Sequence, residues 1–271
     1  MSVEERFETF PQPKSRKLNK LPDNPQKKTS ESAVGPGRFP SWLHRKLPQG
    51  GGLWKTNQIL KEERLHTVCE EAKCPNLLEC YSKKTATFLA MGNQCTRACG
   101  FCDIDTSKTP PSLDPKEPQR IASSVKKLGL KHAVITMVAR DDITDFGASH
   151  LADIIKNIRE ENPETTIEVL TSDFCGNENS IDTVLSQTPN VFNHNIETVR
   201  SLTPRVRHKA TYDRTLQVLN YAHKQAPNIK IKSGIMVGLG ETKEEVFETI
   251  NDLHQAGCNS ITIGQYLQPN R

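Results

Sequence analysis

The sequence lacks any long apolar run. No stretch approaches the roughly 18 residues that cross a bilayer as a helix, so we expect no membrane partner. The apolar segment of a signal peptide is also missing, and Glu4, Glu5 and Glu8 argue against an acid-poor transit peptide. We therefore expect a cytoplasmic protein, because a reducing compartment suits a chain that carries so many thiols.

A charge excess of one sign is also missing from most of the chain. The 271 residues include 36 Lys or Arg and 32 Asp or Glu. Residues 1–50 hold ten of the basic and five of the acidic residues, which leaves 26 and 27 for residues 51–271. A main domain with this balance has no broad basic surface, so we expect no nucleic-acid partner.

Apolar residues are scarce for a chain of this length. They make up 35% of the sequence, which indicates a polar segment beside an ordinary core. Residues 1–37 are rich in Pro, Lys, Ser and Asn and have no apolar period, so we expect a disordered or extended basic tail. We expect residues 38–84 to form an N-terminal extension that carries cysteines, and residues 85–271 to form the main domain.

Short apolar runs alternate with amphipathic segments along the main domain. The segments between the runs carry apolar residues at helical spacing, and in the last one Phe247, Ile250 and Leu253 share a face. That segment starts with a capping box formed by Thr242 and Glu245. This alternation predicts an α/β fold with a parallel sheet and right-handed crossovers. The expected strands are residues 85–91, 133–138, 166–170, 191–196, 229–237 and 260–266.

A doubly wound dinucleotide-binding sheet is the alternative arrangement of such units. Its phosphate-binding glycine fingerprint is missing here. The candidate Gly238-x-Gly240 is followed by Lys243 where glycine is wanted, and it follows the fifth strand rather than the first. The sequence therefore favours another parallel fold.

Cysteine is infrequent but concentrated. The chain has eight, and six of them lie within 34 residues. They form two triplets, Cys69, Cys74 and Cys80 followed by Cys95, Cys99 and Cys102. In a secreted protein such density would indicate disulfides, but without a signal peptide metal binding is the better interpretation. Cys175 and Cys258 stand alone, and we expect both to be structural thiols.

The second triplet lies in the run Cys-Thr-Arg-Ala-Cys-Gly-Phe-Cys, directly after an apolar segment. A structural zinc site wants four protein ligands, usually as two close pairs. Three thiolates fit better a cubane iron–sulfur cluster that keeps one iron open for another ligand. A zinc knuckle or three unrelated buried thiols are the alternatives.

This spacing, with Phe101 directly before the third cysteine, resembles the signature of the radical S-adenosylmethionine (SAM) enzymes. The resemblance implies that Cys95, Cys99 and Cys102 hold a 4Fe–4S cluster whose fourth iron chelates SAM. It also implies that the six strand–helix units form an open, partial (β/α)6 barrel preceded by the cysteine-bearing extension.

Residues 50–271 resemble one family within that superfamily, the lipoyl synthases, and the resemblance is most specific across residues 65–105. The resemblance is carried by the run at residues 65–76, by Glu79 and Cys80, and by Thr-Ala-Thr-Phe at residues 85–88. Tyr81 stands where that family usually has Trp. The resemblance implies that Cys69, Cys74 and Cys80 hold an auxiliary 4Fe–4S cluster that serves as the sulfur source.

The implied reaction inserts sulfur at carbons 6 and 8 of a protein-bound octanoyl chain to make the lipoyl cofactor. Such carbons carry no acidic proton, so the difficult step has to come from a cofactor rather than from acid–base groups. The implied partners are octanoylated lipoyl domains or the glycine-cleavage H protein, and a low-potential electron donor of the flavodoxin or ferredoxin type. Two alternatives stay open, a tRNA methylthiotransferase-like enzyme and a non-catalytic, zinc-stabilised interaction protein.

Polar residues at the carboxyl ends of the expected strands are candidates for contacts with SAM. Asp141 is the candidate for the amino end, and Asn195 and Glu197 are candidates for the ribose and amino groups. Arg207 could pair with the carboxylate, and Gly238 belongs to a glycine-containing segment expected near the adenine. His194 should face the helices, because neighbouring residues of a strand point to opposite sides.

One departure from the family concerns the auxiliary cluster. In lipoyl synthases a serine from an Arg-Ser-Ser-Tyr stretch ligates that cluster, and no such stretch occurs among these residues. We therefore expect this chain to assemble the SAM cluster but to hold the auxiliary cluster weakly. Iron and sulfide assays of the reconstituted protein test this, and a stable content of about eight irons per chain would contradict it.

Overall fold

The computed structural model describes residues 52–63, 65–71, 77–82 and 87–268. All of these belong to the compact unit Arg45–Arg271. The expected basic tail lies outside the described residues, and so do Cys74 and the first two residues of the first expected strand. The division of the chain at residues 37 and 84 stays a prediction.

Seven strands form the main sheet in the order β1-β2-β5-β6-β7-β8-β9. All neighbours from β2 to β9 pair in parallel, and β1 adds to the edge in antiparallel orientation. The strands are β1 (His66–Thr67), β2 (Thr87–Ala90), β5 (His132–Met137), β6 (Thr166–Leu170), β7 (Val191–Asn193), β8 (Lys230–Val237) and β9 (Ser260–Gln265). All six strands predicted from the sequence are therefore present, although most are shorter than expected.

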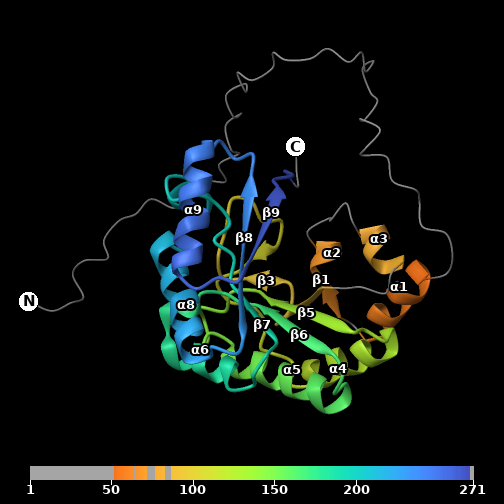
Figure 1. The fold of residues 1–271 in the computed structure, drawn as a ribbon. Coiled ribbons are helices and arrows are strands. Elements are labelled where there is room, and N and C mark those ends of the chain that lie inside the picture. The colour runs from red at the N-terminus through yellow and green to blue at the C-terminus, as the bar shows by residue number, and fades with distance from the viewer. Residues whose placement is uncertain (1–51, 64, 72–76, 83–86, 269–271) are drawn as a thin grey trace, which may run out of the picture. The chain divides into compact units, whose positions relative to one another are not determined.

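Helices connect successive strands and lie around the outside of the curved sheet (Figure 1). The connecting helices are α4 (Glu117–Leu128), α5 (Ala148–Glu161), α6 (Glu178–Leu185), α7 (Thr203–Val206), α8 (Tyr212–Gln225) and α9 (Lys243–Gln255). Near the amino end of the described chain lie α1 (Gly52–Glu62), α2 (Val68–Glu71) and α3 (Leu77–Ser82). No described helix combines the length and the apolar character of a membrane span.

Each crossover helix is amphipathic, and its apolar face closes the core against the sheet. In α5, Leu151, Ile154, Ile155 and Ile158 are fully buried, at the spacing of one helical face. They belong to the same core as Phe192 of β7. Burial of this continuous layer supplies the main driving force for the fold.

The predicted apolar face of α9 is wrong in one respect. Phe247 is 59% exposed, whereas Thr249 and Leu253 are buried and Val246 packs against the core. Both sets of positions fit the helical period, so the rotation of the helix depends on how it docks on the sheet. The exposed ring of Phe247 instead lies beneath the ammonium of Lys243, at 5.6 Å.

The fourth expected strand ends earlier than the sequence indicated. Its ladder stops at Asn193 rather than at residue 196, and a separate bridge joins Glu197 to Ile235 of β8. Between them the Ile196 amide donates to the Ser233 hydroxyl instead of to a backbone carbonyl. Glu197 has a φ of 67°, an unusual backbone conformation for a residue with a side chain. The interruption lies at the cavity described next.

Candidate active site

A cavity of about 410 Å³ lies at the carboxyl ends of the parallel strands. Loops that follow β2, β5, β6 and β7 contribute to its lining, together with Met236 of β8. Parallel pairing brings these ends to the same edge of the sheet, where ligands bind in folds of this kind. The cavity is therefore the candidate active site.

The three-cysteine loop forms one wall of this cavity. Cys95, Cys99 and Cys102 all line it. Two short parallel strands, β3 (Gln94–Cys95) and β4 (Asp105–Thr106), join the two ends of the loop. The Gly100 amide also donates to the carbonyl of Val206, at 2.8 Å. The loop is thus closed at its base and attached near its tip.

Buried contacts hold the chain where it enters this loop. Met91, directly after β2, has a φ of 70°, and its amide donates to the buried carboxylate of Glu117 at 3.0 Å. The same carboxylate oxygen lies 2.6 Å from Nε2 of His150. Residues of α4 and α5 therefore set the direction in which the chain leaves the strand.

The thiols of the loop fit the ligands of an iron–sulfur cluster. Burial raises the pKa of Cys99 to about 11, and the nearby charge of Arg207 acts in the opposite direction. Burial likewise raises the pKa of Cys102. The Arg97 amide donates to the Cys95 sulfur at 3.4 Å, a type of hydrogen bond that tunes cluster sulfurs. Three soft donors around one cavity, with a cation beside them, match the charge of a thiolate-bound cluster.

A single metal ion fits this arrangement less well. The described part of the chain contains no group of three His, Cys, Asp or Glu side chains close enough to hold one ion. Thiols around a cluster bind separate iron atoms, so they do not need to meet at one point.

The first cysteine triplet is only partly described. Cys80 lies in α3 and is half-buried. Cys69 belongs to α2, but its side chain lies outside the described parts, as does the whole of Cys74. The auxiliary-cluster ligands therefore stay a prediction.

Three of the five residues expected to contact SAM lie together in the cavity lining, Asn195, Glu197 and Arg207. Burial raises the pKa of Glu197, while the charge of Arg207 and a hydrogen bond from the Asn195 side chain lower it. The side chain of Asn195 needs the glycine opposite, because a Cβ on Gly234 would lie 2.7 Å from its Oδ1. A carboxylate, an amide and a guanidinium therefore face one space.

Arg207 is held mainly by backbone. Its Nη1 donates to the carbonyl of Asn195 at 2.6 Å, and its exposed fraction is 6%. Its buried Nε has no hydrogen-bond partner among the described residues. The charge of Arg207 acts on the pKa of both Cys99 and Glu197, so a buried cation lines the cavity near both groups.

The other two expected residues, Asp141 and Gly238, are not among those that line the cavity. Asp141 lies beyond β5, where its carboxylate is bound by Arg97. Gly238 lies in the turn after β8 with a φ of 105°, and its amide donates to the side chain of Glu241. The structure therefore separates them from Asn195, Glu197 and Arg207.

The ring of His194 contacts helix α8, as the strand period predicted, although the residue also contributes to the lining of the cavity. Its Nδ1 lies 2.9 Å from the carbonyl of Thr171, and its Nε2 lies 3.3 Å from the hydroxyl of Thr215 on α8. Burial, followed by the charge of Arg207, lowers the pKa of His194 to about 4. A neutral imidazole whose two nitrogens both have hydrogen-bond partners has a structural role.

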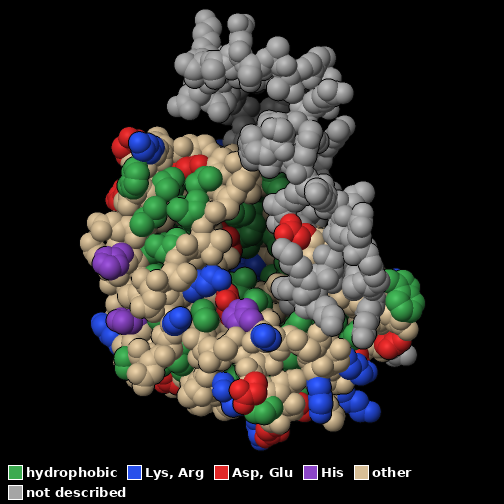
Figure 2. Space-filling model, turned by 45° about the vertical axis from the view of Figure 1, so that its right-hand side comes forward, with side chains coloured by type: hydrophobic (Ala, Val, Ile, Leu, Met, Phe, Trp, Pro, Cys, Tyr) green, Lys and Arg blue, Asp and Glu red, His purple; other side chains and the backbone are tan. Residues whose placement is uncertain are grey.

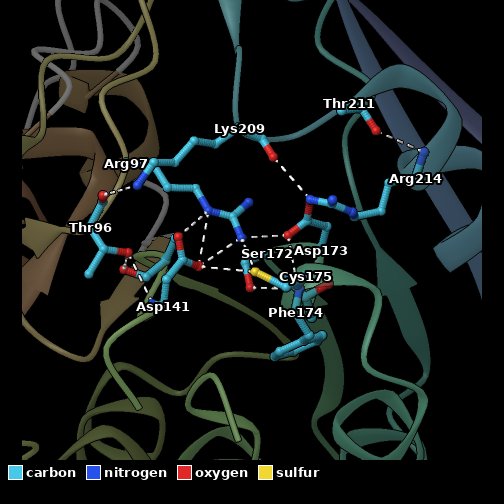
Figure 3. A network of polar contacts seen from close by, with 12 residues as sticks. Thr96, Arg97, Asp141, Ser172, Asp173, Phe174, Cys175, Lys209, Thr211 and Arg214 are labelled. Carbon is cyan, nitrogen blue, oxygen red and sulfur yellow. Dashed lines mark hydrogen bonds and ion pairs between the residues drawn. The ribbon is translucent and has the colours of Figure 1, made fainter. Parts of the chain in front are cut away.

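Sequence reasoning missed the polar network beside the cysteine loop, which Figure 3 shows and whose Arg97 and Asp173 also line the cavity. Arg97 binds Asp141 through Nε at 2.9 Å and through Nη2 at 2.8 Å, and its Nη2 lies 2.7 Å from the carboxylate of Asp173. Arg214 of α8 contacts the other oxygen of Asp173 at 3.2 Å. Cys175, expected to be structural, is exposed and lies 3.2 Å from Nη2 of Arg97. The signal in the sequence that could have pointed to this network is Arg97, a charged residue inside the cysteine run.

The charges in this network are balanced by one another. Burial alone would raise the pKa of Asp173, but hydrogen bonding and the charge of Arg97 outweigh it and hold this pKa at about 2. Arg97 likewise keeps the pKa of Asp141 low against its partial burial. Two arginines thus face two carboxylates in one group, in which Arg97 and Asp173 are buried and Asp141 and Arg214 are partly exposed.

Elsewhere charge is dispersed. Basic and acidic side chains of the described residues are interspersed on the face drawn in Figure 2, without a broad patch of one sign. This agrees with the balanced composition of residues 51–271.

Comparisons with known proteins first define the class. Residues 89–253 match the radical SAM superfamily. Methylornithine synthase has a similar fold, with a TM-score of 0.53 and 13% identity over 78% of this chain and 64% of that one. The hydrogenase maturase HydG aligns with a TM-score of 0.52 and 16% identity over 79% of this chain and 54% of that one. The α/β fold is that of the radical SAM enzymes.

Sequence relatives then give the family. Residues 7–74 match the N-terminal domain of lipoyl synthase. The lipoyl synthase of Protochlamydia amoebophila is 65% identical over 96% of this chain and 80% of its own length. That of Chlamydia felis is 56% identical over 86% of this chain and 75% of its own length. The chain belongs to the lipoyl synthase family of radical SAM enzymes.

Replacing Asp173 with Asn tests the electrostatics of the network. The pKa of Asp173 in the fold, about 2, lies below the ordinary value of 3.8 for an aspartate, so its charge stabilises the fold above about pH 4 and loses this effect as the pH falls toward 2. We expect Asp173→Asn to lower the free energy of unfolding by about 3 kcal/mol near pH 7, because the buried Arg97 and the half-buried Arg214 lose a counter-charge. The difference from the wild type should narrow by about 1 kcal/mol by pH ~3.

Urea unfolding at a series of pH values provides the measurement. The exposed Asp153 of α5 offers a matched control, since Asp153→Asn should change stability little at any pH. A difference between Asp173→Asn and the wild type that stays constant down to about pH 3 would contradict the assignment.

Proposed function

We propose that this chain is a lipoyl synthase that inserts sulfur at carbons 6 and 8 of an octanoyl chain bound to a carrier protein. The observation that carries the proposal is the meeting of Cys95, Cys99 and Cys102 with Glu197 and Arg207 around one cavity. High identity to lipoyl synthases over most of the chain supports the choice within the superfamily.

The cysteine loop would hold the catalytic cluster. Cys95, Cys99 and Cys102 each provide one sulfur ligand, and the fixed charge of Arg207 near Cys99 favours the thiolate form that binds iron. When bound, the cluster and SAM supply the one-electron chemistry that removes hydrogen from unactivated carbon, which side-chain acids and bases cannot do. The apolar residues in the lining of the cavity, such as Leu89 and Met236, limit the access of water.

SAM would bind across the same cavity. Glu197 and Asn195 present acceptors and a donor for its hydroxyl and amino groups, and Arg207 presents a cation on the side of its carboxylate. The partial desolvation that raises the pKa of Glu197 also strengthens any hydrogen bond that its carboxylate makes with a ligand. Asp141 and Gly238 do not line the cavity, so we assign them no direct contact with SAM.

Sulfur would come from the auxiliary cluster on Cys69, Cys74 and Cys80. We propose octanoylated lipoyl domains or the glycine-cleavage H protein as carriers, and a flavodoxin- or ferredoxin-type protein as the electron donor. The cytoplasm, where low-potential donors and reduced thiols are both available, is the proposed location.

Two single substitutions separate the two cysteine triplets. Cys95→Ala should abolish the formation of 5′-deoxyadenosine, because it removes a ligand of the cluster that binds SAM. Cys80→Ala should retain 5′-deoxyadenosine but lose the thiolated product, because it removes a ligand of the sulfur source. The assay is anaerobic reduction of each reconstituted protein with SAM and an octanoyl-lysine peptide, followed by mass spectrometry.

Cys258→Ala is the control, since this buried thiol lies in the core, away from the cavity lining. It should form both products. A colourless wild-type protein that retains zinc would contradict the proposal and favour a zinc-stabilised interaction protein instead. Equal loss of 5′-deoxyadenosine in Cys80→Ala and Cys95→Ala would contradict the assignment of the two cysteine triplets to different clusters.

Glu197→Gln tests the proposed contact with SAM. Loss of a charge-assisted hydrogen bond in a partly desolvated site should weaken the binding of SAM by roughly tenfold or more. Anaerobic isothermal titration of SAM into the reconstituted protein measures the dissociation constant. Glu178→Gln, at the exposed start of α6, is the control, and an unchanged constant in Glu197→Gln would remove Glu197 from the SAM site.

A further inference from the structure

We propose that Arg97 is a positioning residue that fixes the cysteine loop against the ends of β5 and β6, so that Cys95, Cys99 and Cys102 stand ready for the cluster. This inference rests on the proposed function of that loop. It assigns a role to a side chain that lies between two of the three cysteines. The supporting contacts come from several elements that are distant in sequence.

The guanidinium of Arg97 joins two strand-end loops. It forms a two-pronged contact with Asp141 after β5 and an ion pair with Asp173 after β6. Its side chain is only 5% exposed, whereas the next residue, Ala98, is exposed. A planar fork that meets two carboxylates at fixed angles constrains both the position and the orientation of its backbone.

Thr96 strengthens the same attachment. Its amide and its hydroxyl both donate to the carbonyl of Ala139 at 3.0 Å, and the Asp141 amide donates to the Thr96 hydroxyl at 3.0 Å. Lys209 adds a contact from its Nζ to the carbonyl of Thr96 at 3.4 Å. Two consecutive residues of the cysteine loop are therefore attached to the segment that follows β5.

The network reaches the sulfur directly through the backbone. The amide of Arg97 donates to the sulfur of Cys95 at 3.4 Å. Because the guanidinium is bound on two sides, this amide has little freedom to turn away. The arginine thus links the ends of β5 and β6 to a hydrogen bond on a cluster ligand, and outer contacts of this kind orient ligands and tune metal centres.

The turn that presents the second carboxylate is strained. Phe174 and Cys175 have φ values of 45° and 53°, which residues with side chains rarely adopt. The turn places the carboxylate of Asp173 where it accepts from the Cys175 amide and contacts both Arg97 and Arg214. Buried ion pairs contribute little net stability, so a gain in stability alone does not account for a strained turn that supports one. Positioning of the cysteine loop accounts for both the strained turn and the buried ion pair that it supports.

The test compares Arg97→Lys with Arg97→Ala in the full chain. Lysine keeps the charge that Asp173 needs but loses the planar fork, so it separates positioning from charge balance. After anaerobic reconstitution, the rate at which a chelator removes the SAM-responsive cluster is followed by electron paramagnetic resonance. We expect Arg97→Lys to lose this cluster about tenfold faster than the wild type, and Arg97→Ala to lose it faster still.

Arg159→Lys is the matched control. Arg159 of α5 also donates from its guanidinium to two partners, but both bonds come from Nη2 and go to the carbonyls of Gln187 and Thr188, away from the loop. It should lose the cluster at the wild-type rate. Circular dichroism melting should show that Arg97→Lys is folded at the assay temperature. The Arg97→Lys variant therefore tests the proposal even if Arg97→Ala fails to fold.

The outcomes are distinguishable. A wild-type chain without a SAM-responsive signal would contradict the proposed function itself. A wild-type chain with the signal, and Arg97→Lys with the same signal and the same rate of loss, would overturn only the role of Arg97. Equal acceleration in Arg97→Lys and Arg159→Lys would also overturn it, because the effect would then not depend on the loop.

Discussion

Parallel pairing from β2 to β9 is the constraint on which the rest of the molecule depends. Because these six strands run in the same direction, their carboxyl ends meet at one edge of the sheet, and the loops that leave those ends become neighbours. Residues as distant in sequence as Cys95 and Arg207 therefore line one cavity. The crossover helices that allow parallel pairing also supply the apolar layer that stabilises it.

At that edge the structure combines groups of opposite charge that would be unfavourable when buried alone. Arg97 and Arg214 face Asp141 and Asp173 beside the cysteine loop, and Arg207 lines the same cavity as Cys99 and Glu197 and acts on the pKa of both. Each cation thus has an anionic or potentially anionic group beside it. A negatively charged thiolate cluster and a charged ligand both require an environment in which positive and negative groups are balanced and already in place.

Much of the fold was predictable from the sequence. Each of the six expected strands is present, and the capping box of Thr242 and Glu245 forms as predicted at the start of α9. The sequence predicted that the cysteine loop, Asn195 and Glu197 would lie at the carboxyl ends of the strands, and all of them line one cavity there, while their roles in binding stay a prediction. The docking rotation of α9, which exposes Phe247, and the early end of β7 at Asn193 were not predictable, because both depend on how separate elements pack.

What the sequence determined by itself is the chemistry, because ligand type and spacing are local properties that three cysteines within eight residues already contain. The family was likewise recognisable from short runs of residues. Only the tertiary structure decided which strand-end residues share the cavity, placing Arg207 in its lining and leaving Asp141 and Gly238 out of it. Only the tertiary structure joined Arg97 to Asp141 and Asp173, because ion pairs between residues more than 40 positions apart depend on strand order and register rather than on local pattern.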